Sequence, residues 1–121
     1  MTLGLVHREA ASGRWLTLTL MEQLGNIGTE VARAARAKGD GNEARRWNAL
    51  VRALELFDLS IEDDRWRGAK RREIVRAREV VCDFFVGDNT YGSSAESLDR
   101  YFLPFAVAAR RADPDDAVAR T

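Results

Sequence analysis

The chain has 121 residues, and its 19 lysine and arginine residues balance 19 aspartate and glutamate residues. This length predicts a single domain, and a hydrophobic fraction of 45% with only two prolines excludes a disordered or collagen-like chain. The lone Cys82 excludes an internal disulfide, and the sequence holds no Cys/His cluster for a structural zinc site, so we expect no cofactor and no metal.

No apolar run reaches the ~18 to 20 residues that span a bilayer. The N-terminal segment also lacks the apolar run and cleavage site of a signal peptide. We therefore expect a cytoplasmic protein with no membrane partner.

Residues 1–18 carry the weakest structural signal. Residues 15–20 alternate between apolar and polar as a strand would, and residues 3–6 offer a second short strand to pair with them. Two short strands alone are only marginally stable, so we expect an ordered or frayed N-terminal arm.

Helical signals begin at Thr19, which forms a capping-box pattern with Glu22. Apolar residues then recur at helical spacing up to Gly39, which predicts a helix over residues 20–39. Gly25 and Gly28 lie inside this helix and favour close approach by a neighbouring helix.

A second helix is predicted after the N-cap Asn42, and it ends at the acidic residues 62–64. Its apolar stripe consists of Trp47, Leu50, Val51, Leu54, Phe57 and Ile61. A third helix is predicted over residues 69–86, with Ile74, Ala77, Val80 or Val81, and Phe84 as its buried residues. The short connection makes these two helices antiparallel neighbours.

A fourth helix is predicted after the loop at residues 87–92, because Ser93 and Glu96 form a second capping-box pattern. Its apolar face ends before Arg111, and Pro104 inside it predicts a kink. The sequence thus predicts an all-α, antiparallel up-down-up-down four-helix bundle over residues 19–111, with a 1–18 arm and a flexible, disordered acidic tail at 112–121.

The zero net charge hides a local asymmetry. Residues 65–80 carry seven bases and two acids, whereas residues 42–64 carry three bases and six acids, and residues 81–121 carry four bases and seven acids. The candidate residues for binding nucleic acid or a partner are the six arginines on both flanks of the third helix's apolar stripe: Arg65, Arg67, Arg71, Arg72, Arg76 and Arg78. They are either a solvated surface laced with weak ion pairs or a set of phosphate contacts.

Asp58 lies at the edge of the second helix's apolar stripe. With a turn centred near residue 64 it faces residue 70, so we expect a structural ion pair with Lys70, or alternatively with Arg71. An acid–base catalytic role for Asp58 is the less favoured interpretation. His7 is the only histidine, which excludes a His-based catalytic triad, and we expect no enzymatic activity.

A second apolar edge is predicted on the fourth helix. Leu103 and Val107 lie one turn apart and away from the face set by Leu98 and Phe102. We expect an oligomer interface formed by Tyr91, Tyr101, Leu103 and Val107.

The Arg-rich third helix is followed by CDFFVGDN at residues 82–89, and then by Ser93-x-x-Glu96 and SLDRY at residues 97–101. In helix order this pattern resembles small bacterial four-helix-bundle proteins: the accessory variability proteins of diversity-generating retroelements and their relatives encoded in rRNA intervening sequences. The resemblance covers about residues 20–111. It implies a non-enzymatic, ring-shaped homo-oligomer, a pentamer in that family, that binds nucleic acid and a partner reverse transcriptase.

The chain departs from that family in its charge, because the retroelement proteins are strongly basic and this chain is neutral. The departure favours a protein partner or a locally confined RNA contact. We therefore expect an accessory protein that binds RNA, DNA or a protein partner through the third helix. The alternative is a scaffold or interaction module that never contacts nucleic acid, and an enzyme acting through Asp58, Glu73 or the loop at residues 88–89 is the third candidate.

Overall fold

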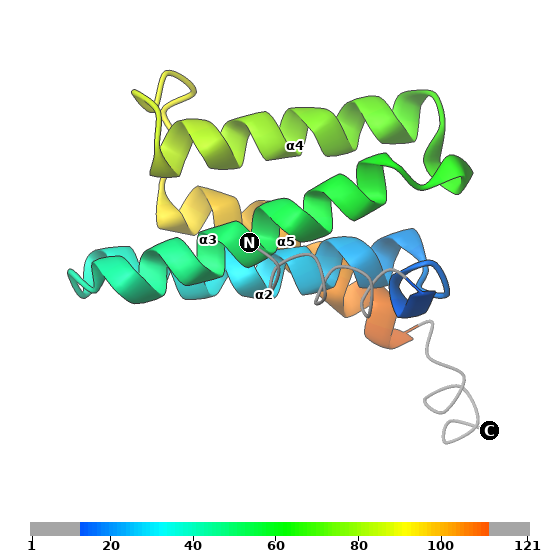
Figure 1. Ribbon diagram of the computed structural model, residues 1–121, viewed down its shortest axis with the longest axis horizontal. Coiled ribbons are helices and arrows are strands. Elements are labelled where there is room, and N and C mark those ends of the chain that lie inside the picture. Colours follow the sequence, from blue (N-terminus) through cyan, green and yellow to red (C-terminus); the bar gives the residue numbers. More distant parts are fainter. Residues whose placement is uncertain (1–12, 112–121) are drawn as a thin grey trace.

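The computed structural model describes residues 13–111 of the chain (Figure 1). Within this range the chain is all-helical and contains no strand, so the all-α class is confirmed. The predictions for residues 1–12, which include His7, and for the acidic tail at residues 112–121 lie outside the described residues.

The first two long helices begin where their caps predict. Helix α2 spans Leu20–Gly39. The Thr19 hydroxyl accepts a 3.1 Å hydrogen bond from the backbone N–H of Glu22. In return, the Glu22 carboxylate accepts a 2.9 Å hydrogen bond from the backbone N–H of Thr19. Helix α3 spans Glu43–Ile61, and the side chain of its N-cap Asn42 accepts a hydrogen bond from the Arg45 N–H. Both caps satisfy backbone donors that have no partner inside the helix.

Helices α4, Ala69–Phe85, and α5, Ala95–Arg111, follow a short 3₁₀ helix η1, Asp64–Trp66. The predicted cap of α5 is wrong by one residue, because Ser94 and Ser97 exchange the two capping hydrogen bonds. Ser93 instead donates its backbone N–H to the Asn89 side chain and belongs to the loop. Helix α5 continues through Pro104.

The strand-like alternation of residues 15–20 does not produce a strand. Residues 13–15 are helical, and the backbone N–H groups of Thr17 and Leu18 donate to the carbonyls of Arg14 and Trp15 in the turn that follows. Trp15 is buried, and its indole N–H donates to the Ser60 hydroxyl at 3.0 Å. The described end of the predicted arm is therefore part of the core.

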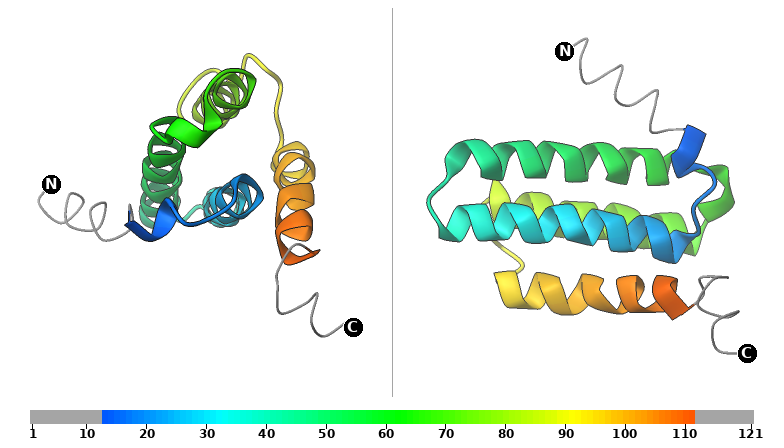
Figure 2. Two further views of the ribbon diagram at one scale, coloured as in Figure 1. Left: turned by 90° about the vertical axis from the view of Figure 1, so that its right-hand side faces the viewer. Right: turned by 90° about the horizontal axis from the view of Figure 1, so that it is seen from below.

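Helix α2 is central to the packing, since it contacts both α3 and α5, while α3 in turn contacts α4 (Figure 2). Helices α4 and α5 make no extensive contact with each other, and a small cavity of about 260 Å³ lies between them. The predicted four-helix up-down arrangement is therefore not confirmed as a closed bundle.

The burial of two tryptophans is the reverse of what the apolar pattern predicts. Trp47 is 53% exposed, although it falls on the predicted stripe, and Ala49 and Ala53 are buried instead. Trp66 is buried, although it lies where the pattern breaks. The reason is η1, which brings the Trp66 ring into the core and directs its indole N–H to Gln23 on α2.

Candidate nucleic-acid interface

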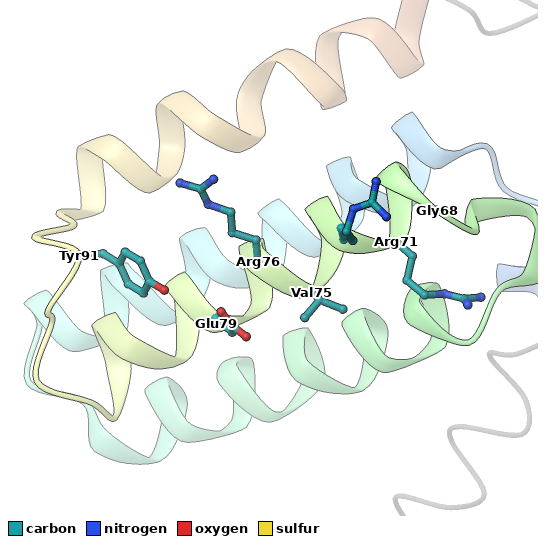
Figure 3. A pocket seen from close by; sticks show the side chains of 7 residues that line it. Gly68, Arg71, Val75, Arg76, Glu79 and Tyr91 are labelled. Carbon is teal, nitrogen blue, oxygen red and sulfur yellow. The ribbon is translucent and has the colours of Figure 1, made fainter.

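One face of α4 is directed away from the core. Ile74, Ala77 and Val81 are buried, and the residues on the opposite side line a shallow hollow of about 730 Å³ (Figure 3). We refer to it as the α4 hollow, and it is lined by Gly68, Arg71, Arg72, Val75, Arg76, Glu79 and Tyr91. The residues of α4 recur at helical spacing, so a single helix presents three arginines to one surface.

The six predicted arginines divide according to their partners. Three of them form ion pairs: Arg65 with Asp63 at 2.7 Å, Arg67 with Asp64 at 3.1 Å, and Arg78 with Asp58 at 3.0 Å. Arg72 and Arg76 are exposed and form no ion pair within residues 13–111. These two guanidinium groups are therefore available to an anionic ligand.

Arg71 is intermediate between the arginines that form ion pairs and those that form none. It is half-buried, and its guanidinium donates to the Asp63 carbonyl at 3.3 Å. Its Nε–H is buried and has no hydrogen-bond partner among the described residues. Arg71 thus lines the α4 hollow while one donor stays unsatisfied.

The Arg65 side chain is held by contacts within the protein. Its guanidinium donates to both carboxylate oxygens of Asp63 and, at 2.8 Å, to the Leu18 carbonyl, and it stacks 4.4 Å from the centroid of the Trp66 ring. These hydrogen bonds hold the pKa of Asp63 below its ordinary value of 3.8, against the opposing effect of burial. The prediction that Arg65 contacts a partner has no support in this geometry, since its donors are already used.

The predicted pair between Asp58 and Lys70 is wrong. Asp58 accepts from Arg78, and the Lys70 ammonium lies 5.6 Å from the centroid of the Trp66 ring. The cause is the connection between α3 and α4, which contains η1 and is longer than the simple turn that the prediction assumes. The observed pair of Asp58 and Arg78 is centred on Gly68, whereas the prediction centred the turn on residue 64.

Tyr91 is presented to the α4 hollow by a loop that α4 itself holds. The Asp83 carboxylate, in the last turn of α4, accepts hydrogen bonds from the backbone N–H groups of Thr90 at 2.8 Å and Tyr91 at 3.0 Å. Sequence reasoning missed this role. The available signal was an acidic residue at a helix C-terminus, where the helix dipole disfavours it and where another partner is therefore required.

The four predicted interface residues do not share one environment. Leu103 is 51% exposed and Val107 is half-buried, both on α5. Tyr101 bridges to α4, donating its hydroxyl to Glu73 at 2.7 Å, and burial together with Glu73 raises the pKa of this phenol. Tyr91 belongs to the α4 hollow, so only Leu103 and Val107 form a candidate contact on α5.

The remaining chemistry of the described chain is sparse. Cys82 is half-buried, and desolvation raises the pKa of its thiol, which disfavours the nucleophilic thiolate. No group of three metal-ligating side chains occurs within residues 13–111. In the same range no helix combines the length and apolar character needed to cross a membrane.

Comparisons of the chain with protein-family models, curated proteins and solved structures gave no match. The resemblance to accessory variability proteins is neither supported nor refuted by them. Inferences about function therefore depend on the geometry of the α4 hollow.

Proposed function

We propose that this protein is a non-enzymatic helical accessory protein that binds nucleic acid through the α4 hollow. The observation that carries the proposal is the pair Arg72 and Arg76. They lie one turn apart on an exposed helix face, and neither forms an ion pair within the described chain. A guanidinium with free donors matches the oxygens of a phosphate group, often in bidentate geometry.

The charge distribution limits the size of this interface. The acidic segment at residues 42–64 precedes α4, and the segment at residues 81–121 is also acidic. An anionic ligand is therefore attracted to the arginine face of α4 and repelled by the acidic segment of α3 that packs beside it. This pattern favours a short, local contact with nucleic acid over a broad one.

The test is binding of short fluorescent RNA and DNA strands at two salt concentrations. Each phosphate contact adds to the salt dependence of the affinity, so Arg72→Glu and Arg76→Glu should each weaken binding about tenfold and reduce the salt slope. Arg100→Glu is the matched control, because Arg100 is exposed on α5 and forms no ion pair within residues 13–111. Undetectable binding at low salt, or equal binding by all three variants, would refute the proposal.

Assembly is the second part of the proposal. Leu103 and Val107 are offered as a contact between copies of a homo-oligomer, and the resemblance adds a pentamer, a cytoplasmic location and a reverse transcriptase partner. Several copies would repeat the α4 hollow around one axis and strengthen its field. Light scattering measures the oligomeric state, and Leu103→Asp should lower the molar mass of the particle. A monomeric wild-type protein would contradict the proposed assembly but not the proposed binding of nucleic acid.

A protein–protein scaffold is the second candidate function. The exposed side chain of Leu103 on α5 favours it, as does the cavity between α4 and α5, which is lined mainly by apolar residues. An oligomer that is disrupted by Leu103→Asp and binds no nucleic acid would favour this candidate. Loss of binding in Arg72→Glu with assembly intact would favour the first.

A further inference from the structure

The α4 hollow differs chemically at its two ends. The arginines lie toward the start of α4, and the other end holds Glu79 and the aromatic ring of Tyr91. Figure 3 shows the Tyr91 ring extending from its loop beside Glu79, with Arg76 on the same side of the helix. A ligand that fills the hollow must therefore be anionic at one end and planar at the other.

Tyr91 has the properties of a stacking platform. It is 56% exposed, and its ring contacts no other aromatic ring within the described residues. Its backbone is already held by Asp83, so little order is lost when a ligand binds. Nucleic-acid bases stack on such exposed aromatic side chains in single-strand binding proteins.

Glu79 determines which part of the ligand lies at this end. Its carboxylate repels a phosphate and can only accept hydrogen bonds while it is charged, so the group beside it must carry N–H donors. Guanine offers two neighbouring N–H donors on its Watson–Crick edge, and the two oxygens of one carboxylate match them. Adenine, cytosine and uracil offer fewer donors at adjacent positions on that edge.

Building on the proposed function, we propose that the α4 hollow binds single-stranded nucleic acid, with phosphates on Arg72 and Arg76 and one base, preferably guanine, stacked on Tyr91 beside Glu79. The two arginines are one helical turn apart, a separation comparable to that of neighbouring phosphates in one strand. A paired base inside a duplex cannot stack on Tyr91, since its faces are covered and its Watson–Crick edge is used.

The experiment uses the full chain and strands of about 12 nucleotides, a length within the site size of single-strand binding domains. Fluorescence anisotropy compares a uridine-rich RNA with scattered guanines, the same RNA with adenines in their place, and a duplex of the first strand. A polyglutamate peptide serves as the competitor. Wild-type protein should bind the guanine strand several-fold more tightly than the adenine strand, and at least tenfold more tightly than the duplex.

Three variants separate the contributions of the ring and the carboxylate. Tyr91→Ala should weaken binding of the guanine strand about tenfold, whereas Tyr91→Phe should stay within about twofold because the ring remains. Glu79→Gln should abolish the preference for guanine without weakening binding of the adenine strand. Circular dichroism and thermal melting check that each variant folds like the wild-type protein.

The outcomes distinguish this inference from the proposed function. If duplex and single strand bind equally, or if Tyr91→Ala binds like the wild-type protein while Arg72→Glu still weakens binding, the single-strand inference fails and the proposed function stands. If guanine and adenine strands bind equally, the role given to Glu79 is wrong. If no nucleic acid binds, both fail. If RNA binds but polyglutamate displaces it at equal concentration, the hollow selects negative charge without selecting nucleic acid, and an acidic protein partner is favoured instead.

Discussion

Ser60 on α3 donates a 2.8 Å hydrogen bond to the Oε1 atom of Gln23 on α2, and neither residue has exposed surface. The same oxygen accepts from the Trp66 indole at 2.8 Å, and the Gln23 Nε2 group donates to the Trp15 carbonyl at 3.0 Å and to Asp63 at 3.2 Å. The Gln23 amide thus fills its hydrogen-bonding capacity with four partners. It joins the segment before α2, the end of α3 and η1.

Replacing this amide should therefore be costly. Gln23→Ala leaves the Trp66 indole N–H and the Ser60 hydroxyl without their acceptor in a buried site, and we expect a loss of about 3 to 4 kcal/mol in the free energy of unfolding. Urea denaturation measures the loss. Asn26→Ala is the control, since Asn26 is exposed on the same helix and should change stability by less than about 0.5 kcal/mol. Equal urea midpoints for the two variants would contradict this role of Gln23.

The pair of Asp63 and Arg65 predicts a stability change in acid. Because Arg65 lowers the pKa of Asp63 below 3.8, the folded state binds fewer protons than the unfolded state near that pH. The stabilisation is complete above pH 3.8 and is lost as the pH falls through the lower folded value. At neutral pH, Arg65→Ala should lose about 1 to 2 kcal/mol, a value discounted because Arg65 is 40% exposed.

The measurement for this pair is urea denaturation across the acid range. The stability difference between Arg65→Ala and the wild-type protein should shrink as the pH falls below 3.8. Arg67→Ala is the control, because both Arg67 and its partner Asp64 are largely exposed, and its stability should match the wild type at every pH. A difference for Arg65→Ala that is independent of pH would show that Asp63 is not its source.

Local signals explain why the helices were predictable. The capping box of Thr19 and Glu22 and the N-cap Asn42 act within four residues, so their positions can be read from the sequence alone. The α5 cap was misplaced because Ser93 and Ser94 are equally good caps by type. The choice depends on Asn89, which has a positive φ of 52° and binds Ser93 in the loop.

Pairing geometry explains what could not be predicted. The arginine-rich segment at residues 65–78 indicated an anion-binding surface, but the sequence does not say which arginines have a carboxylate within reach: Asp63 pairs with Arg65 two residues away, and Asp58 pairs with Arg78 from α3. Arg65 is occupied because Asp63 lies next to η1, and Arg78 is occupied because η1 shifts the register of α4 against Asp58. The position of Tyr91 on the α4 hollow could not be predicted, because the hydrogen bond from its backbone N–H to Asp83 joins a loop to a helix end.

Close packing of α2 against α5 predicts a sharp size limit at Gly28. A Cβ atom at this position would lie 2.5 Å from the Phe102 Cβ and 2.9 Å from its Cγ, so Gly28→Ala must push α5 away from α2. We expect a loss of about 1 to 3 kcal/mol by thermal or urea denaturation. Gly39→Ala is the matched control, because a Cβ atom there meets nothing within 4 Å, and it should be neutral or slightly stabilising. Equal stability of the two variants would argue against this packing.

The loop that carries Tyr91 should depend on Asp83. Asp83→Ala removes both hydrogen bonds to the backbone N–H groups of Thr90 and Tyr91, and we expect these two amides to exchange with solvent much faster while the amides of α2 keep their protection. Hydrogen exchange followed by NMR measures this directly. Asp88→Ala is the control within the same loop, because Asp88 is exposed and its side chain forms no hydrogen bond among the described residues. If Asp83→Ala leaves the exchange of Thr90 and Tyr91 unchanged, the Asp83 carboxylate does not hold this loop.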